Sequence, residues 1–152
     1  MSTEFDTTGG QPMIRLLGTA FDVFADELER RLADTPCSDI RISHGCVFGT
    51  IDPEGSRLTD LATRARMTKQ SVGEVTSDLE QRGYVERVPD PSDGRAKIIR
   101  LTERGRAAQA LGQGLIDELE QEWAERFGEE RIAAFRDALE AITAERLAGV
   151  PA

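Results

Sequence analysis

Cysteine, histidine and long apolar runs are all scarce in this chain, and each scarcity excludes a class of protein. Two cysteines, Cys37 and Cys46, are too few for a disulfide framework. The one histidine, His44, cannot form a zinc set with two unclustered cysteines. His44 and Cys46 are two positions apart on a predicted helix, so their side chains diverge and do not make a nucleophile and base pair. We therefore expect no enzyme, no metal and no other cofactor.

Membrane and secretion signals are also lacking. No apolar run approaches the roughly 20 residues that cross a bilayer, and residues 1–6 lack the positive and apolar regions of a signal peptide. We therefore expect a cytoplasmic protein. The chain has 152 residues, of which 39% are hydrophobic, enough for one domain with a core. Residues 1–11 are polar and glycine-containing, and we expect them to be a disordered tail.

The charge is uneven along the chain. The whole sequence has 19 Lys and Arg against 28 Asp and Glu, a net charge of −9. Residues 57–106 alone have 11 basic and 8 acidic residues, which is net +3 and leaves −12 for the rest. A basic segment in an acidic chain favours a protein that meets phosphate on one face only. The alternative is a solvated surface whose charge is merely uneven.

Hydrophobic periodicity predicts two helices in the first third of the chain. The first covers about 12–34, with an apolar stripe at Met13, Leu17, Ala20, Phe21, Phe24, Leu28 and Leu32, and ends at Thr35-Pro36. The second covers about 38–51, with Ile42, Val47, Phe48 and Ile51 as its buried positions.

The middle of the chain reads as helix, turn, helix and hairpin. A short helix follows Ser56 or Thr59 as its cap, Arg66-Met67 is a turn, and Thr68 caps a second helix that Gly83 ends. Its inward stripe is Val72, Val75 and Leu79. Strands over 84–88 and 96–101 follow, joined by a loop over 89–95 that is rich in Pro and Gly.

Two more helices complete the predicted architecture. Thr102 caps a helix that runs to about Phe127, and Gly128 separates it from the last helix. The fold class is therefore mainly α with a small β-hairpin: a winged helix-turn-helix core plus N- and C-terminal dimerisation helices. We expect a single domain over 12–148, with the winged-helix lobe over about 38–101 and flanking helices, which we expect to form a dimer, over about 12–34 and 103–148. These helices carry more large apolar residues than the core needs, which favours a homodimer, although they can also cover one another in a monomer.

A helix with an adjoining hairpin can recognise duplex DNA. The helix fits the major groove, while the hairpin reaches the minor groove. Gln70 has the paired donor and acceptor that read adenine, Gly73 leaves room for close approach, and Glu74 either accepts from cytosine or repels other bases. The full candidate set is Arg66, Thr68, Lys69, Gln70, Ser71, Gly73, Glu74, Ser77, Asp93, Arg95 and Lys97. The plainer alternative is a solvated helix face and an ordinary turn.

At these residues the chain resembles the MarR family of bacterial winged helix-turn-helix transcription regulators. The resemblance rests on Leu58–Ala62, Thr68–Val72, Leu79–Arg87, Asp90–Arg95 and Leu101–Gly105, and its helix order extends it to roughly 12–148. It implies a homodimer joined by the first and last helices, on a pseudo-palindromic double-stranded DNA operator. It also implies that Arg95 enters the minor groove, steadied by Asp93. Many members have a second arginine at the position of Gly94, a contact for which Lys97 is the candidate here.

The resemblance also implies an input signal. Family members often hold a small aromatic or phenolic effector between the dimer helices and the DNA-binding lobe; the candidates here are Phe21, His44, Phe48 and Trp123, which are otherwise ordinary core or interface residues. Other members oxidise a cysteine in the first helix, which this chain lacks. We expect a homodimeric repressor relieved by a small-molecule effector. The alternatives are a redox-sensing regulator using Cys37 or Cys46, or a winged-helix protein-interaction module without DNA binding.

Overall fold

The computed structural model describes the backbone of residues 10–148 and the side chains of residues 10–144. The expected disordered tail over 1–11 falls almost wholly outside the described residues.

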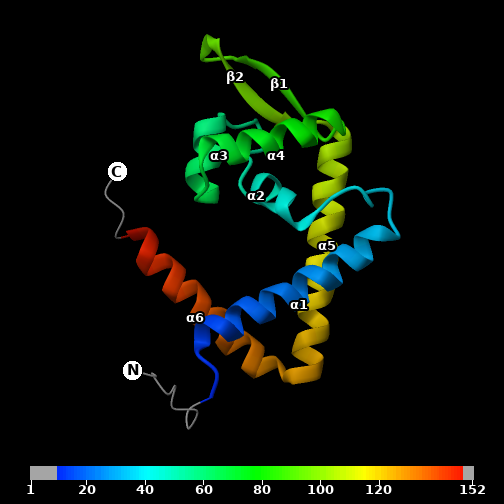
Figure 1. The fold of residues 1–152 in the computed structure, drawn as a ribbon, viewed down its shortest axis with the longest axis vertical. Coiled ribbons are helices and arrows are strands. Elements are labelled where there is room, and N and C mark those ends of the chain that lie inside the picture. Colours follow the sequence, from blue (N-terminus) through cyan, green and yellow to red (C-terminus); the bar gives the residue numbers. More distant parts are fainter. Residues whose placement is uncertain (1–9, 149–152) are drawn as a thin grey trace, which may run out of the picture. The chain divides into compact units, whose positions relative to one another are not determined.

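The chain divides into two compact units, Met1–Ala110 and Leu111–Ala152. The elements in chain order are α1 (Met13–Ala33), η1 (Ile42–His44), α2 (Gly45–Phe48), α3 (Leu58–Ala65), α4 (Lys69–Gln81), β1 (Val85–Asp90), β2 (Asp93–Leu101), α5 (Glu103–Phe127) and α6 (Glu129–Ala148) (Figure 1). The mainly helical fold with one hairpin is confirmed.

None of the helices in the described part of the chain is both long and apolar enough to cross a membrane.

Helix α1 uses only part of its apolar stripe inside the molecule. It ends at Ala33, just before Thr35-Pro36 as predicted. Leu28 and Leu32 are buried, whereas Met13 and Phe21 are 71% and 61% exposed. The N-terminal half of the stripe therefore faces solvent in the single chain.

The predicted helix over 38–51 is wrong in length, because helical structure covers only η1 and α2, residues 42–48. Residues 35–40 form successive turns instead, in which the Ser38 and Ile40 backbone N–H groups donate to the carbonyl oxygens of Thr35 and Cys37. The Arg41 N–H then donates to Nδ1 of His44 at 3.0 Å, which starts η1. Local side-chain and turn bonds of this kind compete with the helix ladder.

The helix-turn-helix is formed by α3 and α4, with α2 and η1 also packed against α4. The expected cap of α3 by Ser56 or Thr59 is wrong: its N-cap is Arg57, which makes no side-chain cap bond, and Ser56 pairs with Ile99 of β2. Arg66 makes the turn in the left-handed conformation, with φ of 54°. The predicted turn at Arg66-Met67 is confirmed.

Both predicted ends of α4 are confirmed. The Thr68 side chain accepts from the Ser71 N–H at 3.1 Å. At the other end Gly83 takes a φ of 78°, and the N–H groups of Gly83 and Tyr84 donate to the carbonyl oxygens of Glu80 and Leu79. Inside the helix Val72, Thr76 and Leu79 are fully buried while Val75 is only half-buried.

The hairpin is longer than predicted. Residues 89–95 were expected to form a loop, but β1 and β2 pair from Val85↔Leu101 to Asp90↔Asp93, with an irregularity between Pro89 and Asp90. Only Pro91 and Ser92 connect the strands. Asp90 closes this turn by accepting from both the N–H and the hydroxyl of Ser92, at 2.8 and 2.7 Å.

The Thr102 cap of α5 is confirmed, since its hydroxyl oxygen accepts from the Gly105 N–H at 3.0 Å. Gly105 lies so close to Tyr84, the residue before β1, that a Cβ there would stand 1.9 Å from the Tyr84 carbonyl oxygen. In the second unit Gly128 separates α5 from α6 with a φ of 104°, and Arg136 of α6 forms an ion pair with Glu120 of α5.

Candidate nucleic-acid interface

The outward face of α4 is an open groove. Its volume is about 470 Å³, and its lining includes Gln70, Gly73, Glu74 and Ser77, which recur at three- and four-residue spacing, together with Arg87 from β1. Gln70 Nε2 donates to Glu74 Oε1 at 3.3 Å. The Ser77 hydroxyl donates back to the Gly73 carbonyl oxygen at 2.8 Å. The structure thus brings four of the sequence-predicted residues together on one surface.

Gly73 is not required by packing within the chain. A Cβ at this position would meet only the Leu58 Cδ2 atom, at 3.7 Å, which is ordinary van der Waals contact. A glycine inside a helix costs about 1 kcal/mol relative to alanine. Packing within the chain therefore does not explain why a glycine occupies this position on the open face of α4.

The hairpin is anchored to the start of α3 by an ion pair. Arg57 Nη2 lies 2.6 Å from Asp90 Oδ2, and the Asp90 side chain is nearly buried. Hydrogen bonds from the hydroxyl and N–H of Ser92, and then from Arg57, lower the pKa of Asp90 to about 2. Asp90 is thus held ionised at neutral pH, which fixes the base of the hairpin tip.

At the tip itself Asp93 orders the backbone. Its Oδ1 accepts from the Arg95 N–H at 3.1 Å, and its other carboxylate oxygen lies 4.0 Å from Arg57. The Arg95 guanidinium is exposed, as are Gly94 and Lys97. Asp93 therefore positions the chain that carries Arg95, and in this structure it does not hold the guanidinium.

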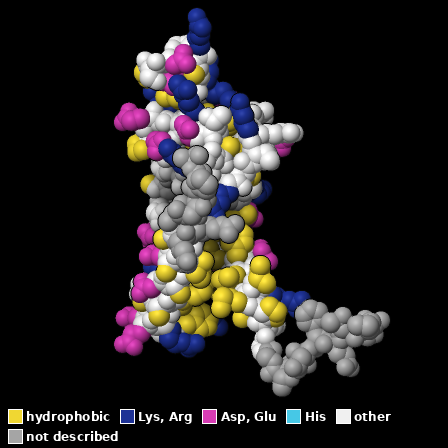
Figure 2. Space-filling model, turned by 90° about the vertical axis from the view of Figure 1, so that its left-hand side faces the viewer, with side chains coloured by type: hydrophobic (Ala, Val, Ile, Leu, Met, Phe, Trp, Pro, Cys, Tyr) yellow, Lys and Arg dark blue, Asp and Glu magenta, His cyan; other side chains and the backbone are white. Residues whose placement is uncertain are grey.

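Ten of the eleven basic residues of the segment 57–106 fall into two groups, and the eleventh, Arg106, donates to the Leu101 carbonyl oxygen at 2.9 Å. Six arginines each form an ion pair with an acid: Arg57, Arg64, Arg82, Arg87, Arg100 and Arg104. Within the described part of the chain, the side chains of Arg66, Lys69, Arg95 and Lys97 have no hydrogen-bond or ion-pair partner and are exposed. These four are the basic residues that the sequence predicts for DNA contact. Figure 2 shows Lys and Arg side chains at the hairpin end of the molecule.

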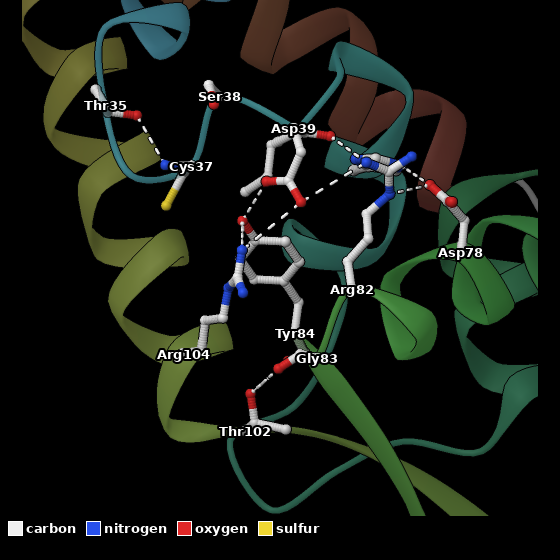
Figure 3. Close-up of polar contacts among 12 residues, drawn as sticks. Thr35, Cys37, Ser38, Asp39, Asp78, Arg82, Gly83, Tyr84, Thr102 and Arg104 are labelled. Carbon is white, nitrogen blue, oxygen red and sulfur yellow. Dashed lines mark hydrogen bonds and ion pairs between the residues drawn. The ribbon is translucent and has the colours of Figure 1, made fainter.

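The opposite end of α4 is held by a polar network that the sequence analysis missed (Figure 3). The Tyr84 hydroxyl donates to Asp39 Oδ1 at 2.5 Å and accepts from Arg104 at 3.0 Å. Arg82 donates to the Asp39 carbonyl oxygen and to Asp78 Oδ2, at 3.1 and 2.8 Å. The network joins the turns after α1 to the end of α4 and the start of α5.

Burial and hydrogen bonding shift the pKa values of the groups in this network. Burial, followed by the hydrogen bond to Asp39, raises the pKa of Tyr84 to about 12. The Tyr84 hydroxyl in turn lowers the pKa of Asp39, and the Arg82 hydrogen bond lowers the pKa of Asp78. No local pattern signals these contacts, because Asp39 and Tyr84 are 45 positions apart.

His44 belongs to the same structural core. It is 4% exposed, its Nδ1 accepts from the Arg41 N–H, and its Nε2 lies 2.9 Å from Asp78 Oδ2. These bonds need the neutral tautomer with its proton on Nε2, which is thus inferred from the partners. Both ring nitrogens are therefore occupied within the chain.

The other three effector candidates lie in different surroundings. Phe48 is half-buried and packs edge-on against Tyr84, with ring centroids 6.1 Å apart. Phe21 is exposed on α1. Trp123 lies in the second unit, edge-on to Phe127 at 6.4 Å. Phe21, His44 and Phe48 thus belong to the first unit and Trp123 to the second.

The two cysteines are poorly placed for oxidation. Cys37 is buried, and burial raises the pKa of the Cys46 thiol. A thiol with a raised pKa is less often the thiolate that reacts.

Comparisons with known proteins agree with this geometry. Residues 39–96 match the model of the MarR family. The chain is 32% identical over 68 residues to the HTH-type transcriptional regulator BilQ of Clostridioides difficile, covering 43% of this chain and 46% of that protein. It spans about half the length of the curated relatives it matches.

Solved structures cover more of the chain. CouR from Rhodococcus jostii RHA1, bound to p-coumaroyl-CoA, is 25% identical with a TM-score of 0.68, over 84% of this chain and 88% of that one. FabT of Streptococcus pneumoniae, in complex with DNA, has a TM-score of 0.73 at 21% identity, over 87% of this chain and 93% of that one. Residues 39–96, which include α4 and most of the hairpin, thus match the MarR family model, and the chain shares its fold with these solved structures over most of its length.

Proposed function

We propose that the protein is a sequence-specific transcription regulator that binds duplex DNA with α4 in the major groove and the hairpin tip in the minor groove. The observation that carries the proposal is the set of four unpaired cations, Arg66, Lys69, Arg95 and Lys97, around the outward face of α4 and at the hairpin tip. Cations without internal partners are available to displace the counterions of phosphate. BilQ is a transcriptional regulator by name, and FabT has been solved with DNA, which supports the same use here.

The acting form is a homodimer. The exposed side chains Met13, Ile14, Leu17 and Phe21 form a broad apolar surface on α1, and Phe127, Phe135 and Ile142 are exposed in the second unit. Figure 2 shows hydrophobic side chains gathered away from the hairpin end of the molecule. Contiguous exposed apolar surface of this kind is typical of an interface. A twofold dimer presents two α4 helices to a pseudo-palindrome whose half-sites lie about 34–36 Å apart.

Selection of bound duplexes from a random pool tests both statements. We expect a pseudo-palindromic site, bound in a strongly salt-dependent manner, and a dimer in sedimentation at micromolar concentration. Phe21→Glu should give a monomer with weak binding, whereas Thr19→Glu, an equal change of charge away from the apolar face of α1, should remain a dimer. A monomer without preference among duplexes contradicts the proposal, and leaves the fold as a protein-interaction module.

The regulator is a repressor released by a small apolar or aromatic ligand. Phe21, Phe48 and Trp123 are the candidate contacts, and CouR, which is bound to p-coumaroyl-CoA, is a precedent. A ligand that lowers DNA affinity tenfold must prefer the non-binding state by about 1.4 kcal/mol. The competing input is oxidation, which the surroundings of Cys37 and Cys46 disfavour. If peroxide releases wild-type protein from DNA but not the Cys37→Ser, Cys46→Ser variant, the protein is a redox sensor instead.

A further inference from the structure

Glu74 differs from the other acids of α4. Asp78 is bonded by Arg82 and His44, and Glu80 pairs with Arg87 at 3.1 Å. Glu74 is exposed, and its one recorded partner among the described residues is the neutral amide of Gln70. An uncompensated carboxylate therefore stands in the middle of the groove that faces DNA in the proposed function. Such a charge is repelled by phosphate, so it lowers affinity unless it makes a specific contact.

The neighbours of Glu74 favour a base contact. Gly73 has no side chain to keep a base edge away, and packing does not require it. Ser77 is bonded back to its own helix. Gln70 Nε2 donates to Oε1 of Glu74, which leaves Oε2 without a partner among the described residues. The groove thus presents a carboxylate acceptor beside Gly73.

The chemistry of the major groove selects the base. A carboxylate only accepts hydrogen bonds, and the donors on base edges in this groove are the amino groups of adenine and cytosine. Guanine and thymine turn acceptors toward the groove and are repelled. Adenine adds the N7 acceptor beside its amino group, whereas cytosine presents only the N4 donor. A lone carboxylate is therefore best matched by cytosine.

We propose, resting on the proposed function, that Glu74 is a specificity-determining residue that accepts from the N4 amino group of a cytosine in each half-site and rejects the other bases. Gln70 is its positioning residue. The charge lowers affinity for every duplex, and it lowers affinity least for the duplex that offers an amino group.

The test is a competition assay with duplexes carrying each of the four base pairs at every half-site position, on the full-length dimer. Wild type should prefer C·G at one position by about tenfold or more. Glu74→Ala should lose that preference and bind the disfavoured duplexes more tightly than wild type. Glu74→Gln should shift the preference toward A·T, because an amide offers the donor and acceptor that adenine pairs with. Glu54→Gln, the same loss of charge in the exposed turn before α3, should leave base preference unchanged.

The outcomes separate this inference from the proposed function. If wild type selects a duplex but both Glu74 variants keep its base preference at every position, the inference is wrong and the DNA-binding function stands. If wild type selects no duplex in a salt-dependent manner, the proposed function fails and the inference falls with it. Thermal unfolding of each variant establishes that the compared proteins are folded.

Discussion

The two ends of α4 use the same residue types in opposite ways. At its C-terminal end Arg82 and nearby Arg104 are tied to Asp39, Asp78 and Tyr84, so their charges hold the fold together. At its N-terminal end Lys69 has no partner, and neither do Arg66 before it nor Arg95 and Lys97 in the hairpin, among the residues that the structure describes. A count of charges does not separate these two groups of basic residues. The presence or absence of an ion-pair partner separates them, and it identifies which cations remain available to a polyanion.

The largest expected effect comes from removing the four unpaired cations of the segment 57–106. The variant with alanine at Arg66, Lys69, Arg95 and Lys97 should lose DNA affinity by about 10³-fold or more, with a much flatter salt dependence, because eight counterion-displacing contacts disappear from the dimer. Its free energy of unfolding should stay within about 0.5 kcal/mol of wild type, since exposed unpaired residues are replaced. Alanine at Arg126 and Arg131, exposed in the second unit, is the control. Retained affinity would place the interface elsewhere.

At the C-terminal end of α4, where the charges are paired, a substitution should change the stability of the fold. His44→Phe keeps a ring in the core but leaves the Arg41 N–H without its acceptor and Asp78 with Arg82 alone, which should lower the free energy of unfolding by about 1–3 kcal/mol. Lys69→Ala, an exposed change, should lower it by less than about 0.5 kcal/mol. Urea unfolding measures both. If His44→Phe leaves stability unchanged but alters the response to ligand, His44 belongs to an effector site after all.

The same contrast explains which structural features sequence predicts. The ends of α4 and the start of α5 follow from Thr68, Gly83 and Thr102, whose capping preferences act within a few residues. The sequence also places Arg66, Lys69, Arg95 and Lys97 in its candidate DNA-binding set, which stays a prediction, but it does not indicate that they are unpaired. The Asp39 to Tyr84 bond was not predictable, since it depends on how distant segments fold together.

Two errors have the same origin. The predicted helix over 38–51 failed because turn bonds and the contact between Arg41 and His44 took backbone groups that a helix would use. The predicted loop over 89–95 failed because Asp90 closes a tight turn and is itself held by Arg57, 33 positions earlier. Composition indicated a turn but not how far the strands would pair toward it.

A smaller effect with opposite signs is expected at Gly73. Gly73→Ala should stabilise the fold by about 1 kcal/mol, because the new methyl group meets only Leu58 in ordinary contact. It should at the same time weaken operator binding, because it adds atoms to the face that approaches the bases. Gly112→Ala in α5, where a Cβ meets nothing within 4 Å, should stabilise similarly and leave DNA binding unchanged. Unaltered affinity for Gly73→Ala would mean that the helix does not approach DNA closely at this point.

The smallest effect distinguishes the two roles available to Asp93. Its carboxylate orders the tip by accepting from the Arg95 N–H, and it also adds a negative charge close to the proposed minor-groove contact. Asp93→Ala removes both and should weaken binding a few-fold, less than Arg95→Ala, which should lower the salt slope by about one charge. Asp93→Asn keeps an acceptor for the Arg95 N–H but removes the charge, so it should bind as tightly as wild type or slightly more tightly. Equal weakening by Asn and Ala in a salt titration would show that the charge of Asp93, rather than the turn it closes, positions Arg95.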